Sequence, residues 1–313
     1  MEDFYEVKVQ EIKQLTPTIK SFTFISENTE LPSFGAGSHI TLHLPMGMRQ
    51  YSLINNPLDM INEYEIAVKK TGHLESGSTY LHEDIYEGDV VKVSPPDNYF
   101  PLQMEGKHHV FFAAGIGITP FWSMMSYLRS LGESFELHYA VSGQDACPFY
   151  NEMNERYANQ VTYYLMDRDS KTKKLKERLR ELKVGTHVYI CGPQSYMDFI
   201  VTYCRELGYP KKYIHEERFK ARKLEHPTRF KVTIVNEKKT IQVNSNQSLL
   251  EALHDAGITI PSACRQGICG SCEVKVCNGE VLHNDTFLTA NEKTDKMLTC
   301  VSRGKGHISI AVE

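Results

Sequence analysis

Over the first hundred residues, apolar and polar side chains alternate in short segments that are separated by turn residues. Alternation with a period of two is typical of strands that have one buried face. The segments are residues 5–12, 19–25, 39–44, 50–54, 64–68 and 90–93. Short strands at this spacing predict an antiparallel β-barrel, which we place at residues 1–104.

From about residue 107 the pattern changes to buried strands that alternate with helices. The expected strands are residues 109–114, 135–141, 161–166 and 187–191, and the expected helices are residues 120–131, 149–157, 175–182 and 195–207. Alternating strands and helices indicate a parallel sheet with helices on its faces. We therefore predict an α/β nucleotide domain at residues 105–222.

The last third of the chain begins with a polar, basic, proline-containing segment, of which we assign residues 223–229 to a linker. Residues 230–235 and 240–243 predict a hairpin, and residues 307–312 predict a closing strand. Between them, Ser248 and Glu251 have the spacing of a capping box at the start of a helix. We expect an α+β domain at residues 230–313.

Length and charge narrow the class of protein. At 313 residues the chain is longer than one hydrophobic core usually organises, which agrees with several domains. Its net charge of −4 argues against a nucleic-acid partner. The longest uncharged apolar run, residues 110–118, is too short to span a membrane, and no signal segment is evident. We expect a cytoplasmic monomer without a membrane partner.

Four cysteines in the last domain follow the plant-type pattern for ligating a [2Fe–2S] cluster, Cys-x4-Cys-x2-Cys with one distant cysteine. They are Cys264, Cys269, Cys272 and Cys300. A loop that wraps a cluster needs residues that tolerate positive φ, and Gly267 and Gly270 supply them. Zinc is the alternative, but structural zinc usually takes two Cys-x2-Cys pairs, and only Cys269 and Cys272 form one. A disulfide would need an oxidising compartment, for which the sequence gives no signal.

The barrel contains Arg49-Gln50-Tyr51-Ser52, a tetrapeptide suited to a flavin. A guanidinium can grip a phosphate, an aromatic ring can stack on an isoalloxazine, and a hydroxyl can hydrogen-bond a ring nitrogen. On a strand, Arg49 and Tyr51 share a face, whereas Ser52 needs a strand end or a bulge to reach the same ligand. A surface arginine beside a core tyrosine would give the same tetrapeptide.

The segment after the next strand strengthens the flavin interpretation, because it is suited to bind a phosphate. Val68 and Lys69 end that strand, and Gly77 and Ser78 lead into a short helix expected to start at Thr79. Free N–H groups at the start of a helix favour a phosphate. The alternative is an ordinary helix cap by Ser78.

Two motifs of the nucleotide domain lie where strands end. Gly115-Ile116-Gly117-Ile118-Thr119-Pro120 turns the first strand into a helix. Its glycines let the backbone approach a ligand, Thr119 can cap the helix, and Pro120 suits its first position. A later strand ends in Cys191-Gly192-Pro193, at the carboxyl edge where open α/β sheets bind ligands. Cys191 is either a buried thiol or a substrate contact, and its place at the edge favours the contact.

The choice between nicotinamide cofactors is expected at residues 142–145, Ser-Gly-Gln-Asp. A 2′-phosphate requires a cation, and this loop offers one anion and no cation, so NADH is favoured. Arg168, Lys171 and Lys173 follow the next strand, so NADPH is not excluded.

With Arg49-x-Tyr51-Ser52, Gly115-x-Gly117-x-Thr119-Pro120, Cys191-Gly192-Pro193 and the four cysteines in this order, the whole chain resembles the phthalate dioxygenase reductase family. The resemblance implies an FMN barrel, an NADH domain and a C-terminal β-grasp ferredoxin domain that passes electrons to an oxygenase. It implies flavin contacts on the barrel motif, phosphate contacts at residues 77–79, and nicotinamide contacts at the two strand-end motifs.

The resemblance adds one candidate residue and one doubt about the flavin. In this family an aromatic residue at the place of Phe219 covers the flavin face where nicotinamide must lie, which makes Phe219 the candidate gate. Family members commonly carry an arginine where this chain has Glu75, beside the phosphate site. Because that change removes a cation, both FMN and FAD are retained as candidates.

We therefore predict an NADH-dependent oxidoreductase that passes electrons through flavin and a [2Fe–2S] cluster to the Rieske centre of a separate oxygenase. Flavin is needed because NADH gives up two electrons together and the cluster accepts one. Ser52, Cys191 and Phe219 are the candidate catalytic residues. The alternatives are a self-sufficient FAD-dependent reductase of a small molecule and a non-catalytic redox sensor. The oxygenase substrate is left open among aromatic acids, methoxyaromatics and quaternary amines such as carnitine.

Overall fold

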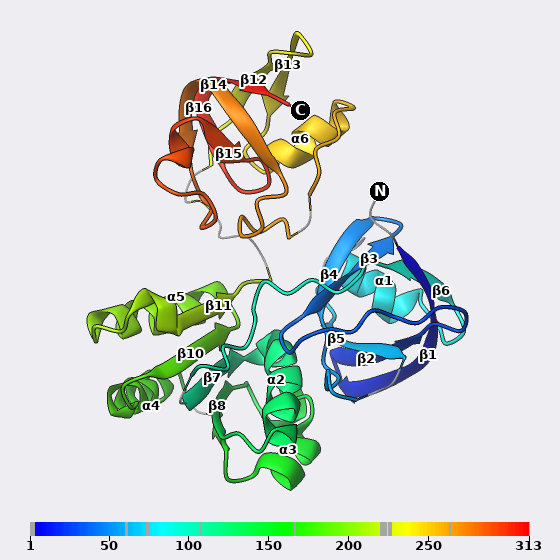
Figure 1. The fold of residues 1–313 in the computed structure, drawn as a ribbon, viewed down its shortest axis with the longest axis vertical. Coiled ribbons are helices and arrows are strands. Elements are labelled where there is room, and N and C mark those ends of the chain that lie inside the picture. The colour runs from blue at the N-terminus through cyan, green and yellow to red at the C-terminus, as the bar shows by residue number, and fades with distance from the viewer. Residues whose placement is uncertain are drawn as a thin grey trace. The chain divides into compact units, whose positions relative to one another are not determined.

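The computed structural model describes residues 4–59, 62–72, 76–106, 108–165, 167–219, 224, 227–262 and 264–312. The chain divides into two compact units, Met1–Glu217 and Arg218–Glu313. In Figure 1 the first unit is drawn in blue to green and the second in yellow to red. The linker expected at residues 223–229 lies partly outside the described residues, and the boundaries expected after residues 104 and 222 stay predictions.

Six antiparallel strands of the first unit form a sheet in the order β4-β3-β6-β1-β2-β5. They are β1 (Tyr5–Thr16), β2 (Ile19–Ile25), β3 (His39–Leu44), β4 (Gly47–Ser52), β5 (Glu63–Lys69) and β6 (Val90–Val93). The two ends of this order meet, because Leu53 after β4 bridges Ile66 of β5. The sheet therefore closes on itself around a core that includes Phe22, Ile40 and Leu42. The predicted barrel is confirmed.

Two elements of the barrel differ in their bounds from the expectation. β4 starts at Gly47, where a φ of +100° makes the turn from β3, and it ends at Ser52 rather than continuing to residue 54. Helix α1 (Gly77–Glu83) begins two residues earlier than expected. Its cap is Ser76 rather than Ser78, because the Ser76 hydroxyl accepts a hydrogen bond from the N–H of Thr79 at 3.2 Å.

Five parallel strands form the second sheet, in the order β11-β10-β7-β8-β9, which confirms the predicted α/β domain. They are β7 (His108–Ala114), β8 (Phe135–Ala140), β9 (Val161–Tyr164), β10 (Thr186–Cys191) and β11 (Ile214–Glu217). The helices are α2 (Thr119–Ser130), α3 (Tyr150–Tyr157), α4 (Arg168–Glu181) and α5 (Gln194–Glu206), with short 3-10 helices η1 (Gly115–Ile118), η2 (Gln144–Ala146) and η3 (Lys211–Tyr213). The sequence pattern did not predict β11.

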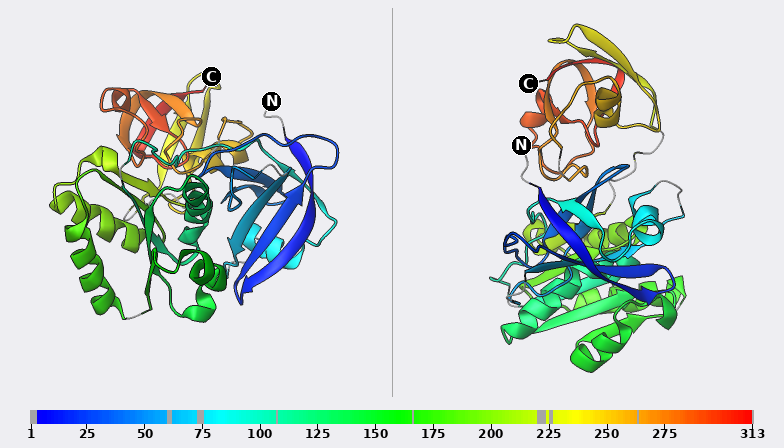
Figure 2. Two further views of the ribbon diagram at one scale, coloured as in Figure 1. Left: turned by 60° about the horizontal axis from the view of Figure 1, so that its bottom comes forward. Right: turned by 90° about the vertical axis from the view of Figure 1, so that its right-hand side faces the viewer.

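Helices cover both faces of this sheet (Figure 2). Phe111 and Ala113 of β7 pack with α2 and α3, whereas the intervening Phe112 packs with α4 and α5. The first of these faces also packs against Ile54 and Ala67 of the barrel, so the barrel and the nucleotide sheet share one core. That shared core fixes the ends of the barrel strands relative to the ends of the nucleotide-domain strands.

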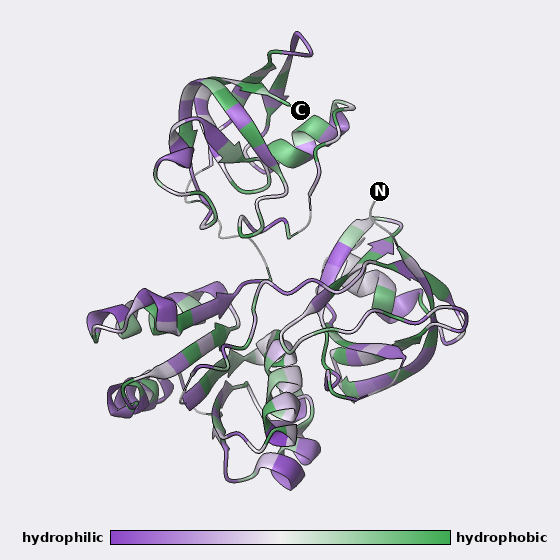
Figure 3. Ribbon diagram, in the orientation of Figure 1, coloured by the Kyte–Doolittle hydropathy of each residue, from purple (hydrophilic) through white to green (hydrophobic). Residues whose placement is uncertain are grey.

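Helix α4 is two turns longer than the segment 175–182 that the pattern predicted. It is mostly hydrophilic (Figure 3), and its only fully buried side chains among those described are Leu175 and Leu179. Its first turns carry no apolar stripe, so periodicity could not reveal them. They are instead started by Asp167, whose carboxylate accepts hydrogen bonds from the N–H groups of Asp169 and Ser170.

The second unit is a mixed five-stranded sheet in the order β13-β12-β16-β14-β15, packed on one helix. Its elements are β12 (Phe230–Ile234), β13 (Lys239–Val243), α6 (Leu249–Asp255), β14 (Glu273–Leu282), η4 (Glu292–Thr294), β15 (Lys296–Leu298) and β16 (Arg303–Ala311). β12 and β16 run parallel in the middle of the sheet. The capping box of Ser248 and Glu251 is confirmed, whereas β14 and β15 were not predicted. In the part of the chain that the structure describes, no helix combines the length and the apolar character of a membrane span.

Candidate functional site

The two strand-end motifs of the nucleotide domain meet at the point where the strand order reverses. β7 and β10 are neighbours, and the chain goes from β7 to one side of the sheet and from β10 to the other. Gly115 follows β7, and Gly192 follows β10. Ligands of open α/β sheets bind in the crevice at such a switch point. The structure therefore brings these motifs together as the sequence analysis expected.

Close packing explains why the motifs contain glycine. A Cβ on Gly117 would lie 2.3 Å from the carbonyl oxygen of Cys191, and a Cβ on Gly192 would lie 2.8 Å from Cβ of Ala114. The Gly115 turn has a φ of +57° and is fixed by the Tyr139 hydroxyl, which donates to the Gly115 carbonyl at 2.8 Å. The two turns thus form one rigid backbone surface with no side chain between them.

Thr119 does not cap the helix as expected. The 3-10 helix η1 comes first, so Thr119 is the first residue of α2, and its hydroxyl donates to the Ile116 carbonyl at 3.1 Å. Pro120 occupies the first turn of α2 as predicted. Pro193 is the cap residue of α5 and makes no side-chain cap. Thr119 therefore stabilises the turn itself.

A buried polar group joins the barrel to this edge of the sheet. Ser52, the last residue of β4, donates a hydrogen bond to a carboxylate oxygen of Glu217 at 3.5 Å. Burial raises the pKa of Glu217 to about 8, and it also raises the pKa of the Cys191 thiol, as does the nearby Glu217 carboxylate. At neutral pH both groups are therefore uncharged. Buried groups with such shifts are common where a protein handles protons or ligands.

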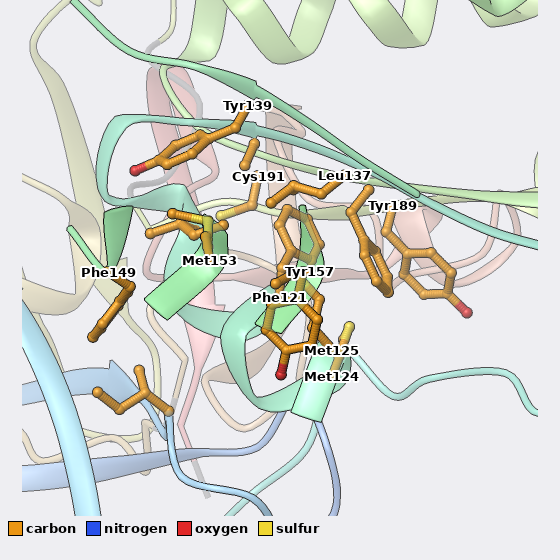
Figure 4. Close-up of a cluster of buried hydrophobic side chains, with 14 of the residues drawn as sticks. Phe121, Met124, Met125, Leu137, Tyr139, Phe149, Met153, Tyr157, Tyr189 and Cys191 are labelled. Atoms are coloured by element: carbon orange, nitrogen blue, oxygen red, sulfur yellow. The ribbon is translucent and has the colours of Figure 1, made fainter. Parts of the chain in front are cut away.

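In the sequence, the segment Glu217-Arg218-Phe219 drew attention, but a role was given only to Phe219 and none to Glu217. Residues 214–217 carry no clear strand signal, and only the sheet order shows that β11 ends beside Cys191. Cys191 is completely buried and lies in the cluster of side chains in Figure 4, among Tyr139, Leu137 and Tyr189. Phe219 belongs to the second unit and is 42% exposed, so its role as a gate stays a prediction.

Arg49 and Tyr51 lie together against the start of α1. A Cβ on Gly77 would lie 2.6 Å from Cγ of Arg49 and 3.2 Å from the Tyr51 hydroxyl, so a larger residue there would displace these side chains. The Arg49 guanidinium donates to the Met48 carbonyl at 2.8 Å, and no described carboxylate forms an ion pair with it. An arginine with free donors beside a tyrosine and a helix start fits an anionic ligand such as the phosphate of a flavin. The geometry brings the two side chains together, and their sharing of one ligand stays a prediction.

Four hydroxyls gather beside this cradle. The Ser78 hydroxyl lies 2.8 Å from that of Thr71 and 3.0 Å from that of Ser76, and the Thr79 hydroxyl donates to the Thr71 carbonyl at 3.2 Å. Val68 is buried and Lys69 is exposed at the end of β5. Glu75, which prompted the comparison of FMN with FAD, lies outside the described residues.

The four cysteines of the second unit approach one another in two pairs. The Cys264 thiol donates to Cys269, which lowers the pKa of Cys269, and the Cys300 thiol donates to Cys272, which lowers the pKa of Cys272. Among the described residues, no three His, Cys, Asp or Glu side chains are grouped to hold a single metal ion. Two pairs of thiols suit a cluster of two irons, each of which takes two thiolates.

The backbone of the cysteine loop is shaped to face sulfur. Gly267 and Gly270 have positive φ, as predicted, and so does Arg265, at +54°. The N–H of Gln266 lies 3.3 Å from Sγ of Cys264, and the N–H of Gly267 is directed to Cys300. N–H groups aimed at sulfur stabilise thiolates, so these residues fit a [2Fe–2S] cluster.

The loop expected to select the nicotinamide cofactor is exposed at the carboxyl end of β8. Gln144 and Asp145 are both exposed, and no described cation pairs with Asp145. β9 is the neighbouring edge strand, so Lys171 and Lys173 follow at the same side of the sheet. The side chain of Arg168 lies outside the described part. The preference for NADH stays a prediction.

Two family models match the chain. The model described as the 2Fe-2S iron-sulfur cluster binding domain matches residues 232–305. The model described as the dimethylamine monooxygenase subunit DmmA-like, N-terminal domain, matches residues 90–214. The first match covers all four cysteines of the cluster pattern, and the second covers both strand-end motifs of the nucleotide domain.

Whole-chain similarity extends this result. The chain is 39% identical to the heme-dependent oxidative N-demethylase beta subunit of Ectopseudomonas mendocina, with 98% of each chain covered. It is 35% identical to the carnitine monooxygenase reductase subunit of Acinetobacter baumannii, with 97% of this chain and 96% of that protein covered. The solved structure of phthalate dioxygenase reductase matches with a TM-score of 0.80 and 33% identity, over 99% of this chain and 98% of that one.

Proposed function

Because this chain belongs to the phthalate dioxygenase reductase-like family, we propose that it oxidises NADH with FMN and delivers single electrons through its cluster to the Rieske centre of a separate oxygenase. The chain is an oxidoreductase, the reductase component of an oxygenase system, and transfers electrons through a flavin and a [2Fe–2S] cluster. The proposal concerns the particular nicotinamide, flavin, residues and acceptor. We keep the monomer and the cytoplasmic location as predictions.

The observation that carries the proposal is the meeting of Ser52, Cys191 and Glu217 at the switch point of the nucleotide sheet. Ser52 comes from the barrel strand that also carries Arg49 and Tyr51, whereas Cys191 and Glu217 end strands of the nucleotide sheet. A flavin held by the barrel motif and a nicotinamide held by the strand-end turns would therefore share one small, uncharged region. This is the arrangement that electron transfer between the two rings requires.

A bound flavin would supply the conversion between two-electron and one-electron chemistry. The residues around it would hold it and exclude water. Arg49 and the N–H groups at residues 77–79 would hold its phosphate, Tyr51 would stack on its ring system, and Ser52 would hydrogen-bond the ring. Ser52 and Glu217 also form a chain of two protonated groups leading away from that ring, which can hold or pass a proton.

We propose FMN rather than FAD because Arg49 is the one cation among the described contacts at Gly77, and FMN carries a single phosphate. Arg49 is the cation nearest to it that the contacts identify, since Lys70 is paired with Glu83 at 2.7 Å. One phosphate can be satisfied by Arg49 and the neighbouring N–H and hydroxyl groups. Mass spectrometry of the flavin released by heat would decide between FMN and FAD.

NADH would enter on the Gly115 and Cys191 turns. Gly115, Gly117 and Gly192 leave the backbone bare, so a nicotinamide can approach it closely. Neutral Cys191 and Glu217 add no charge beside the ring. Asp145 would repel the 2′-phosphate of NADPH, because two anions near each other raise the energy of the complex.

The reduction potentials favour electron transfer from the cluster to a Rieske centre over transfer in the reverse direction. Plant-type clusters lie near about −400 mV, and Rieske centres lie at about −150 mV or above. A gap of about 250 mV corresponds to about four powers of ten in the equilibrium constant for one electron. A Rieske centre would therefore keep the electrons that it receives.

A second candidate acceptor is a haem iron. The relative from Ectopseudomonas mendocina is a subunit of a heme-dependent N-demethylase, and the model that matches residues 90–214 is named for a dimethylamine monooxygenase subunit. The carnitine monooxygenase relative also belongs to an enzyme of an N-methylated amine. These observations favour an amine as the substrate of the oxygenase with either acceptor.

The test is to supply reconstituted protein and NADH, without oxygen, to the purified terminal components of the two relatives' systems. These are the carnitine monooxygenase of Acinetobacter baumannii and the N-demethylase of Ectopseudomonas mendocina. Reduction of a Rieske centre would be followed by its electron paramagnetic resonance signal, and reduction of haem by its Soret shift under carbon monoxide. Transfer to either one supports the reductase function and identifies the acceptor class. Failure with both, by protein that reduces cytochrome c, contradicts the proposal.

A further inference from the structure

The cluster loop of the second unit has an aromatic ring lying on it. A Cβ placed on Gly270 would lie 2.4 Å from the ring carbons Cε1 and Cζ of Phe287, so the ring rests directly on the backbone of Gly270. Gly270 follows Cys269, and Cys269 is the only one of the four loop thiols that is not buried. Phe287 therefore lies beside the part of the loop that is nearest to solvent.

Phe287 is 46% exposed, so burial of its own side chain does not fix its position. The segment is held by Asp285, whose side chain is completely buried and whose carboxylate accepts a hydrogen bond from the N–H of Leu288 at 3.0 Å. The N–H of Thr286 donates to the Gly267 carbonyl at 3.0 Å, which ties the segment to the cluster loop. Lys293 reaches both the Asp285 carboxylate, at 3.4 Å, and the Asp285 carbonyl, at 3.1 Å.

Hydrophobic stability does not explain this arrangement. Leu288, the next residue, packs in the core and is 5% exposed, so the segment is already anchored by an apolar side chain. An aromatic ring left half in water loses much of the free energy that burial would give. Rigid aromatic side chains with little entropy to lose are favoured as anchors at interfaces.

We propose that Phe287 is the anchor with which the reductase docks its terminal oxygenase, and that the ring enters an apolar pocket of that partner next to Cys269. In each encounter one electron leaves the cluster and one iron of the partner is reduced, and no bond is formed or broken. This inference rests on the proposed function, because it needs a separate protein as acceptor. It adds the surface through which the electrons leave.

Two features of the chain favour an external partner over the chain's own flavin unit. The flavin unit and the ferredoxin domain are parts of one chain, and such a tether supplies a high local concentration without an adhesive surface. The ferredoxin domain from residue 229 to residue 313 contains 10 Lys and Arg and 9 Asp and Glu, a net charge of +1. Long-range charge steering is therefore weak, so a short-range apolar contact must supply the affinity for a diffusing partner.

The experiment compares Phe287→Ala with Phe287→Trp and with the control Val235→Ala in the full-length, cofactor-loaded protein. Val235 is also exposed, at 49%, but it follows β12, whereas the cluster loop adjoins β14 and β15 at the other side of the sheet. The partner is whichever of the two terminal components the wild-type protein reduces. Three quantities are measured: the Kd of the oxidised protein for the partner, the rate at which NADH reduces the cluster, and the rate of electron delivery to the partner.

We expect Phe287→Ala to raise the Kd and the KM for the partner about tenfold, with NADH reduction of the cluster unchanged. A tenfold change corresponds to about 1.4 kcal/mol, which exceeds the cost of truncating most interface residues to alanine. Phe287→Trp should retain most of the affinity, and Val235→Ala should match the wild type. A Kd within twofold of the wild type for Phe287→Ala overturns the proposal, and so does slower cluster reduction with an unchanged Kd, which would assign Phe287 to the internal step. Wild-type protein that reduces neither terminal component would instead refute the proposed function.

Discussion

Replacing Gly117 with alanine tests the nucleotide site at its tightest point. The added Cβ would lie 2.3 Å from the carbonyl oxygen and 2.5 Å from the carbonyl carbon of Cys191, and 2.8 Å from the N of Gly192. All three neighbours are backbone atoms, so no side-chain rotation can relieve the overlap. A carbon and a carbonyl oxygen in contact usually lie about 3.3 Å apart, so the Gly115 turn and the Cys191 turn must separate by about 1 Å.

The size of the effect follows from that displacement. Overpacking of this kind typically costs about 1–3 kcal/mol, and a misplacement of about 1 Å at a reacting site can cost about a hundredfold in rate. We expect the rate of flavin reduction by NADH to fall between tenfold and a hundredfold in Gly117→Ala. Stopped-flow absorbance of the flavin under anaerobic conditions measures this rate directly.

A matched control is available in the barrel. Gly35 has no positive φ, and the atom nearest to a Cβ on it would be Nδ2 of Asn98 at 3.4 Å, an ordinary van der Waals distance, so Gly35→Ala should behave as the wild type. Reduction by dithionite should be equal in all three proteins, because it does not use the nucleotide turns. If Gly117→Ala is folded, holds flavin and is reduced by NADH at the wild-type rate, the contact between the two turns does not position the nicotinamide.

Three further changes test the other parts of the site. Cys272→Ser should abolish cytochrome c reduction and retain at least half of the NADH–ferricyanide activity, which can draw electrons from the flavin; loss of both activities would contradict separate sites. Gly77→Ala should lower flavin affinity at least tenfold, because its Cβ would lie 2.6 Å from Cγ of Arg49, and fluorescence titration with FMN measures this. Glu217→Gln should remove a pH dependence of stability. Burial raises the pKa of Glu217 from 4.5 to about 8, so the wild type loses stability as pH rises through that window, by at most about 5 kcal/mol, whereas the glutamine variant does not. Urea unfolding at pH 5 and pH 8 measures the free energy of unfolding of both proteins. If that free energy changes equally with pH in the wild type and in the glutamine variant, the carboxyl group of Glu217 is ionised in the folded protein.

Local patterns predicted the features of this protein that depend on a few neighbouring residues. The spacing of Cys264, Cys269 and Cys272, the capping box at Ser248 and the alternation along β2 each carry their information within about ten residues. The need for a strand end at Ser52 was also a local argument, since a side chain on a strand alternates its direction. Each of these expectations agrees with the structure.

Long-range features could not be predicted in the same way. Glu217 became part of the site only because β11 pairs with β10, and residues 214–217 alone give no strand signal. Phe287 lies 17 residues from Gly270 in sequence, and their contact depends on how Asp285 holds the intervening chain. Hydrophobic periodicity carries no information about such contacts, because they depend on the register of strands that are far apart in the chain.

The protein separates the reduction of its flavin from the delivery of electrons by its cluster. This separation indicates which surface must select the acceptor protein. A cluster near about −400 mV can reduce many iron centres of higher potential, so potential alone does not select the acceptor. On the proposed assignment, the nicotinamide lies among backbone and neutral groups at Gly117, Cys191 and Glu217, and the electron that leaves the cluster carries no trace of that chemistry. On the docking proposal above, a diffusing acceptor contacts the surface around Cys269, where Phe287 is 46% exposed. A change of oxygenase partner during evolution would then require changes on this small surface, while the flavin and nucleotide sites could stay as they are.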